Sequence, residues 1–391
     1  MYSNRLSWSF SANAYSQRVL QARSDGIPLL DLSSSNPTTV DFNYPHREIA
    51  EALKDADDLS YSPDPLGEAR SRQAVQMYYS RRGLDVEADR ILLTASTSEA
   101  YSYLFKLLSD PGDEVLAPRP SYPLFEYLAS LESVRIVSYW LRYDGGWHID
   151  FEDLKRRISP RTRAIVVVNP NNPTGSFLKK DEADRLLALA AEREIPVIAD
   201  EVFFDYPLAM TDGIATTLVN RHDVLSFSLN GLSKAAGMPQ MKLGWMVLNG
   251  PAEERERARQ RLELILDTYL SVNTPVQRAL PALLEAGESM QAQIVGRTRR
   301  NLAALENLLR DSAAHPLYAE GGWSAIVRLP GTQDEESWLV DLLEQERVIA
   351  QPGYFFDLEC GRSLVVSLIT PPETFHEGIS RMAKLVERTV A

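Results

Sequence analysis

The sequence predicts an α/β fold with a large domain and a smaller one. Short runs of β-branched and aliphatic residues alternate with helical patterns through the middle of the chain, which is typical of a mostly parallel sheet covered by helices on both faces. After about residue 290 short strands and helices follow in a different order, as in an α+β unit. We expect a large domain at 48–285 and a small domain built from 1–47 and 286–391, because 391 residues exceed the usual length of one domain.

The clearest unit of the large domain runs from residue 164 to residue 200. The run AIVVV at 164–168 predicts a buried strand, and the turn-rich NPNNPTG that follows cannot continue it. A helix is then expected to start near Asp181 as its N-cap, with four apolar residues at helical spacing: Ala183, Leu186, Leu187 and Ala190. A second strand at 195–199 ends at Asp200, which completes a βαβ crossover.

The remaining elements follow from the same periodicities. Further strands are expected at 114–117, 224–227, 243–248, 323–328 and 364–368. Helical spacing of apolar residues predicts helices around 101–108, 251–270, 290–311 and 373–389. The segment 251–270 is so highly charged that we expect a surface helix leading away from the sheet.

Composition excludes several classes of protein. The net charge of −13 argues against nucleic acid or anionic lipid as a partner, because both select clustered Lys and Arg. No run approaches 18 apolar residues and the N-terminus lacks the apolar core of a secretory signal, so we expect neither a membrane span nor export. The single cysteine, Cys360, is expected to be an inert thiol without a metal, which favours a cytoplasmic location.

Four stretches carry the residues that could perform chemistry. They are TASTSEA at 94–100, NPNNPTG at 169–175, ADEVFFDY at 199–206 and NGLSKAAGMPQMKLGW at 230–245. Each follows an expected strand, so all four should meet at the carboxyl edge of the sheet, where such folds bind ligands. The common motifs GxGxxG, GxxxxGK[ST], HExxH and GxSxG are absent from the sequence.

Three features of these stretches point to one cofactor. Lys234 lies among small and turn-forming residues, where a desolvated amine of lowered pKa can form a Schiff base with an aldehyde. Asp200 ends an apolar strand and needs a cationic partner, for which a pyridinium nitrogen would serve. The hydroxyls at 96–98 open a helix and offer a phosphate site. Aldehyde, ring nitrogen and phosphate together describe pyridoxal 5′-phosphate (PLP).

The same residues resemble the fold type I PLP-dependent aminotransferases of class I/II. The resemblance rests on NNPTG, then ADE, then SK in that order and spacing, and it extends over nearly the whole chain. It implies that Lys234 holds the cofactor covalently and then moves a proton, and that Asp200 keeps the ring nitrogen protonated. It also implies that Asn172 donates to the ring's O3′ and that Tyr122 stacks on the ring.

The phosphate site and a dimer are implied in the same way. Thr97, Ser98 and Ser233 would hold the phosphate, and Tyr61 would reach the phosphate of a neighbouring subunit. That last contact requires a homodimer with shared active sites. Each residue also has an ordinary role open to it: Asn172 and Tyr61 lie in turn-rich segments, and Tyr122 could pack in the core.

Three positions depart from the family pattern. Lys242 stands where relatives usually place an arginine that grips the phosphate, so the charge is kept but the bidentate fork is lost. Phe203 replaces a tyrosine that donates to O3′, and its loss should raise the pKa of the Schiff base. Val365 replaces the arginine that clamps the substrate carboxylate, and Arg362 is our hypothesis for a substitute anchor.

These departures leave three functional readings open. The first is a ping-pong aminotransferase acting on an amino acid or amine and a 2-oxo acid. The second is a decarboxylase, lyase or cyclase that uses the same lysine and electron sink. The third is a PLP-binding or regulatory protein without turnover, which retention of both Lys234 and Asp200 argues against.

Overall fold

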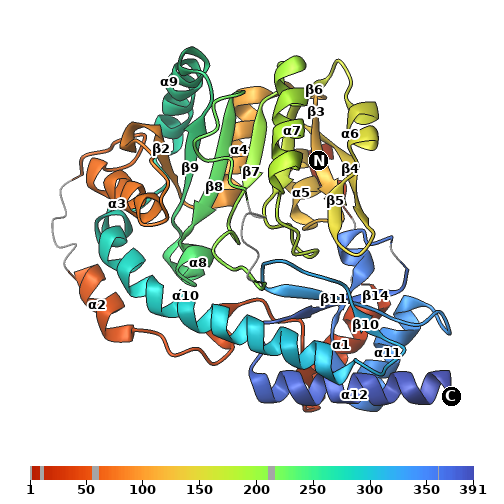
Figure 1. The fold of residues 1–391 in the computed structure, drawn as a ribbon. Helices are drawn as coiled ribbons and strands as arrows, with labels where there is room; N and C mark the ends of the chain where they lie inside the picture. The colour runs from red at the N-terminus through yellow and green to blue at the C-terminus, as the bar shows by residue number, and fades with distance from the viewer. Residues whose placement is uncertain (1, 9–12, 55–60, 210–215, 360) are drawn as a thin grey trace.

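The computed structural model describes residues 2–8, 13–54, 61–209, 216–359 and 361–391. It contains a large α/β unit and a smaller α+β unit, as the sequence predicts (Figure 1). Cys360 lies outside the described residues. None of the helices in these ranges has the length and apolar character needed to cross a membrane.

An eight-stranded sheet forms the centre of the large unit. In spatial order its strands are β2 Ile91–Thr94, β9 Gly244–Asn249, β8 Ser226–Gly231, β7 Val197–Asp200, β6 Thr162–Val168, β3 Glu114–Arg119, β4 Arg135–Tyr143 and β5 Trp147–Ile149. Five neighbouring strands from β8 to β4 run parallel, whereas β9 is antiparallel to both of its neighbours and β5 is antiparallel to β4. The prediction of a mostly parallel sheet is therefore confirmed.

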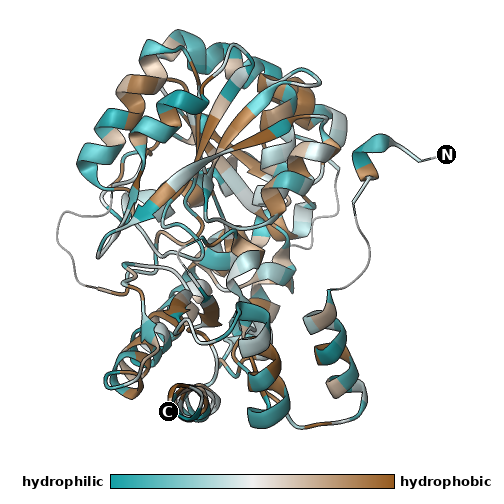
Figure 2. Ribbon diagram, turned by 90° about the vertical axis from the view of Figure 1, so that its right-hand side faces the viewer, coloured by the Kyte–Doolittle hydropathy of each residue, from teal (hydrophilic) through white to brown (hydrophobic). Residues whose placement is uncertain are grey.

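Helices cover both faces of this sheet (Figure 1). One face packs against α4 Thr97–Leu108, α5 Leu124–Leu131 and α9 Ala252–Tyr269. The other packs against α6 Phe151–Arg157 and α7 Lys180–Glu192. The strands at the centre are mainly hydrophobic, while the covering helices turn hydrophilic faces outward (Figure 2).

Two local predictions are corrected by this packing. Helix α9 does not lead away from the sheet, because Ala258, Leu262 and Leu266 are buried in the same cluster as α4. Its charged residues occupy the outer side only. Helix α7 begins at Lys180 rather than after Asp181, since the Glu182 carboxylate accepts the Lys179 N–H and fixes the first turn earlier.

The small unit combines both ends of the chain. Its sheet has the order β10 His315–Pro316, β11 Ser324–Arg328, β14 Ser363–Ser367 and β13 Gln351–Pro352. The N-terminal β1 Leu30–Asp31 pairs in parallel with β12 Val348–Ile349. Three helices complete a common core with these strands: α1 Ala14–Ser24, α11 Glu335–Glu346 and α12 Pro372–Val390.

The long helix α10 joins the two units. It runs from Thr274 to Leu308, and Figure 1 shows it passing beneath the large sheet toward α12. Its first half packs with α2 His46–Lys54, α3 Ala69–Ser80 and α8 Leu232–Ala235, and its end joins the core of the small unit. A boundary at 285 falls inside this continuous helix, so the division into domains stays a proposal.

Candidate active site

The carboxyl ends of β6, β7 and β8 bring three of the four motifs together. Val168 pairs with Asp200 and Asp200 pairs with Leu229, so β6 and β7 end level with each other, while β8 continues to Gly231. Helix α8 begins directly after β8 and carries Lys234. The fourth motif follows β2, which lies parallel to β8 on the far side of β9. The prediction that the motifs meet at one sheet edge is therefore confirmed.

Asp200 lies at this edge in surroundings that provide little stabilisation for its charge. Its Oδ1 accepts the Val202 N–H at 3.3 Å and its Oδ2 accepts the Tyr101 hydroxyl at 3.2 Å. Burial raises the pKa of Asp200 to about 6, against the opposing effect of these two donors and of Lys234. The described part of the chain provides Asp200 with no ion pair. This carboxylate can therefore take a cationic ligand atom.

Lys234 points into an aromatic enclosure. Its Nζ lies 4.5 Å from the centroid of the Trp323 ring and 5.2 Å from that of Phe203. Burial lowers the pKa of Lys234 to about 8, and the Asp200 charge offsets part of this shift. About one tenth of the Lys234 side chains are therefore neutral, nucleophilic amines at pH 7, far more than for a lysine of ordinary pKa.

The position of α8 is fixed from the opposite side by α10. A Cβ at Gly287 would lie 2.5 Å from the Ala236 Cβ, so only glycine lets the two helices approach so closely. The Lys234 carbonyl also accepts a hydrogen bond from the buried Tyr206 hydroxyl. These two contacts hold the lysine backbone while its side chain stays free to react.

Asn172 faces the small unit from the NPNNPTG loop. Its Oδ1 accepts a hydrogen bond from the Ser324 hydroxyl at 3.2 Å. The loop is braced internally, because the Asn171 Oδ1 accepts the Thr174 hydroxyl at 2.9 Å. Since Oδ1 of Asn172 is occupied, its amide NH₂ remains available as a donor.

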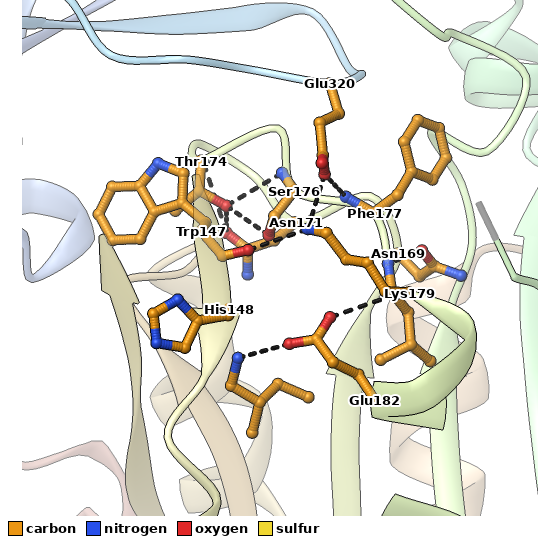
Figure 3. Close-up of polar contacts among 12 residues, drawn as sticks. Trp147, His148, Asn169, Asn171, Thr174, Ser176, Phe177, Lys179, Glu182 and Glu320 are labelled. Atoms are coloured by element: carbon orange, nitrogen blue, oxygen red, sulfur yellow. Dashed lines mark hydrogen bonds and ion pairs between the residues drawn. The ribbon is translucent and has the colours of Figure 1, made fainter. Parts of the chain in front are cut away.

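A partly buried ion pair fixes the far end of this loop (Figure 3). The Lys179 Nζ lies 2.8 Å from the Glu320 Oε2 and donates to the Trp147 carbonyl. The same Glu320 oxygen accepts the Phe177 N–H at 2.8 Å. Glu320 precedes Trp323 by three residues, so this network ties the Asn172 loop to the segment that carries the aromatic wall around Lys234.

The N-terminus of α4 has the character of an anion site. Ser96 caps the helix by accepting the Glu99 N–H, while the hydroxyls of Thr97 and Ser98 have no partner among the described residues. A Cβ at Gly244 would lie 3.3 Å from the Thr97 nitrogen, so this glycine lets β9 reach the helix end. Free N–H groups, free hydroxyls and the helix dipole favour a phosphate here.

Four other expected residues lie around the site with differing exposure. Ser233 is partly buried on α8, beside the lysine. Lys242 is exposed in the left-handed conformation at φ 51°. Tyr122 is 46% exposed in the loop after β3, and Tyr61 is 76% exposed beside Leu270 and Thr274. The structure brings neither tyrosine into contact with Lys234 within its own chain.

The expected substrate anchor lies elsewhere. Strands β11 and β14 pair Ser324 with Ser367 at the site end and Arg328 with Ser363 at the other end. Arg362 precedes Ser363 and is exposed near Gly331, so the structure does not bring it to Lys234. Val365 is buried opposite Ile326 and contributes an apolar side chain at the position where the family resemblance predicts an arginine.

Sequence reasoning missed three residues that line the site. The helical spacing indicates only a core role for Tyr101, Tyr206 is one residue of a longer motif, and Trp323 lies 89 residues beyond Lys234. The high aromatic content of ADEVFFDY is the available signal in the sequence. In the structure Phe203, Tyr206 and Trp323 form one aromatic cluster. Contact between segments so far apart cannot be inferred from local patterns.

The structure is that of an α/β protein with a buried lysine and a buried carboxylate at the carboxyl edge of its large sheet. The chain matches the family described as aminotransferase class I and II over residues 27–381, and it belongs to that family. It is 27% identical to a glutamate-pyruvate aminotransferase of Haemophilus influenzae, with 95% of this chain and 93% of that protein covered. It is 29% identical to the glutamate-pyruvate aminotransferase of Escherichia coli K12, with 85% and 84% covered.

Solved structures agree with this assignment. The chain superimposes on an alanine aminotransferase of Pyrococcus furiosus with a TM-score of 0.87 and 26% identity, covering 99% of this chain and 100% of the other. An aminotransferase of Escherichia coli gives a TM-score of 0.86 at 25% identity, with 99% and 98% covered. The protein is therefore an aminotransferase, an enzyme that moves an amino group between an amino acid and a 2-oxo acid.

Proposed function

We propose that this aminotransferase works with PLP held covalently by Lys234, in a ping-pong double displacement. The observation that carries the proposal is the pairing of a nucleophilic amine of lowered pKa with a carboxylate of raised pKa at one sheet edge. When bound, PLP supplies an aldehyde for amine exchange and a ring that accepts electrons from the substrate Cα.

The residues present fit the chemical groups of this cofactor. Asp200 forms no ion pair within the described part of the chain, and a protonated ring nitrogen would supply one. The free hydroxyls of Thr97 and Ser98 at the start of α4 suit its phosphate. Asn172, whose Oδ1 is taken by Ser324, keeps its NH₂ for the ring's O3′.

Lys234 has two tasks in this proposal. It holds the cofactor until the substrate amine displaces it, and the released amine then carries a proton to and from the substrate Cα. A pKa of about 8 suits this second task, because a general base works best when its pKa lies near the working pH. The aromatic rings of Trp323 and Phe203 limit the access of water to the transferred proton.

The proposal also includes further cofactor contacts, an amino donor and a dimer. Ser233 and Lys242 are proposed for the phosphate and Tyr122 for the ring face. We propose glutamate or alanine as the amino donor, because the relatives are named glutamate-pyruvate and alanine aminotransferases. We propose a homodimer because Tyr61, which the family resemblance assigns to the phosphate of a neighbouring subunit, is 76% exposed in its own chain. The cytoplasmic location stays a prediction.

The test uses the half-reaction. Protein saturated with PLP is mixed with glutamate or alanine without an oxo acid, and one equivalent of donor should convert the aldehyde form of the cofactor to its amine form. A decarboxylase or lyase would return to the starting spectrum, and a protein without turnover would bind the donor and stop. Borohydride reduction followed by peptide mapping should place the label on Lys234, and a label elsewhere would overturn the proposal.

A further inference from the structure

Tyr101 is a buried tyrosine whose hydroxyl faces the Asp200 carboxylate. The hydroxyl lies 3.2 Å from Oδ2, and the residue is 2% exposed. Its ring packs edge-on against Phe125 at a centroid distance of 5.2 Å, which fixes the direction of the hydroxyl. Burial and the Asp200 charge both raise the pKa of Tyr101, so the tyrosine stays protonated and donates.

No other described side chain donates to Asp200. The Val202 N–H serves the other oxygen, Oδ1, at 3.3 Å. The ionisable groups that act on this carboxylate are Tyr101 on α4, Lys234 on α8 and Glu201, its neighbour in the chain. Lys234 would be engaged by the cofactor aldehyde, so the tyrosine is the one side-chain donor left to favour the ionised form.

We propose that Tyr101 is a positioning residue that keeps Asp200 ionised and aimed at the ring nitrogen of the cofactor. The inference rests on the proposed PLP site. A hydrogen bond to a carboxylate stabilises its charged form more than its neutral form, and the ring nitrogen needs the charged form as its partner.

Helix α4 carries both Tyr101 and the residues proposed for the phosphate. Thr97 and Ser98 lie one turn earlier on α4, at the end proposed for the phosphate. Residues four apart lie on the same side of a helix, so Thr97 and Tyr101 face the sheet edge together. One helix therefore sets the two ends of the cofactor, with the phosphate at its N-terminus and the nitrogen partner one turn inside.

The test measures cofactor affinity against pH in Tyr101→Phe. The substitution removes one hydroxyl and keeps the ring, and losing the hydrogen bond should raise the pKa of Asp200 by about one unit. PLP binding, followed by quenching of protein fluorescence, should then weaken by about fivefold near pH 6, approach a tenfold loss below about pH 5, and change little near pH 8. Tyr139→Phe is the matched control, because its hydroxyl is also buried but donates to the Val166 carbonyl.

A double variant separates positioning from simple structural damage. In an Asp200→Asn background the added Tyr101→Phe change should leave the pH profile of PLP binding unmoved, because no titrating carboxylate remains. The inference would be overturned if Tyr139→Phe weakened PLP binding at acid pH as much as Tyr101→Phe does. It would also be overturned if Tyr101→Phe bound PLP with wild-type affinity at every pH. If wild-type protein fails to bind PLP through Lys234, the proposed function itself fails, and the two failures are thereby distinguished.

Discussion

The two sides of the active site are built in different ways. The cofactor side consists of Asp200, Lys234 and the start of α4, each a few residues from the end of a strand in one sheet. The opposite side consists of Trp323 and Ser324, brought there by a second sheet more than eighty residues further along the chain. The first side depends on local strand-end geometry, and the second depends on how two units pack.

This difference separates chemistry from recognition. Polar groups on the cofactor side have shifted pKa values and unfilled hydrogen-bonding capacity, as a site that performs reactions requires. The opposite side presents the Trp323 ring and the Ser324 hydroxyl, which can select a substrate by shape and by neutral hydrogen bonds. Substitutions on the cofactor side should therefore change the rate of the reaction. Substitutions on the opposite side should change substrate preference and the packing of the two units.

The largest expected effect comes from Lys234→Ala. Loss of the covalent anchor and of the proton carrier together should reduce kcat by at least about 10⁴-fold, as expected for removal of both nucleophile and general base. Steady-state amino transfer and borohydride labelling measure it. Lys180→Ala, which removes an exposed lysine at the start of α7, is the control. Residual turnover above one hundredth of wild type would show that the chemistry does not depend on the cofactor side as described.

Breaking the Lys179–Glu320 ion pair, which links the two sides of the active site, should have the next largest effect. Lys179→Met leaves the Glu320 carboxylate buried with, among the described residues, only the Phe177 N–H as a partner. We expect a loss of about 2–3 kcal/mol in unfolding free energy, less than for a fully buried pair because Lys179 is partly exposed. A fall of about tenfold in kcat/KM should accompany it, since small displacements near the reacting atoms slow catalysis.

The double variant Lys179→Met with Glu320→Gln sharpens this test. It removes the charge that the single variant strands, so denaturant unfolding should show most of the lost stability restored. If the single variant is as stable and as active as wild type, the ion pair does not couple the two sides.

A smaller effect concerns the stability of the cofactor-free protein against pH. Burial raises the pKa of Asp200 from 3.8 to about 6 and that of Glu201 from 4.5 to about 7. The folded chain then binds more protons than the unfolded chain between about pH 4 and 7, so stability falls as the pH rises through this window. The lowered pKa of Lys234 acts in the opposite sense, and stability should rise between about pH 8 and 10.5.

Two variants show which residue causes each part of the dependence of Tm on pH. Lys234→Met should remove the alkaline rise in Tm, and Asp200→Asn should reduce the acid-side fall while leaving the part due to Glu201. An alkaline limb that survives in Lys234→Met would show that the lysine titrates normally in the folded protein.

The sequence predicts the cofactor side better than the side that faces it, for physical reasons. A strand that ends at Asp200 and a lysine among small residues are local signals, because strand period and turn chemistry fix where those side chains lie. The Tyr101 hydroxyl could not be predicted, because the helical stripe marks it as core without indicating the carboxylate it meets. Trp323 and Ser324 depend on the packing of β11 against the large sheet, which no local pattern encodes.

Arg362 provides the smallest expected effect and the sharpest comparison. It is exposed beside Gly331 at the end of β14 that lies away from Ser324, so Arg362→Ala should change KM for amino and oxo substrates by less than about twofold, as for a solvated surface charge. Arg310→Ala, at another exposed position, is the control. A tenfold rise in KM confined to Arg362→Ala would restore this residue as a substrate anchor. It would also require the end of β14 near Arg362 to reach the site. The opposite side, which includes Trp323 and Ser324, would then have to rearrange when substrate binds while the cofactor side stays fixed.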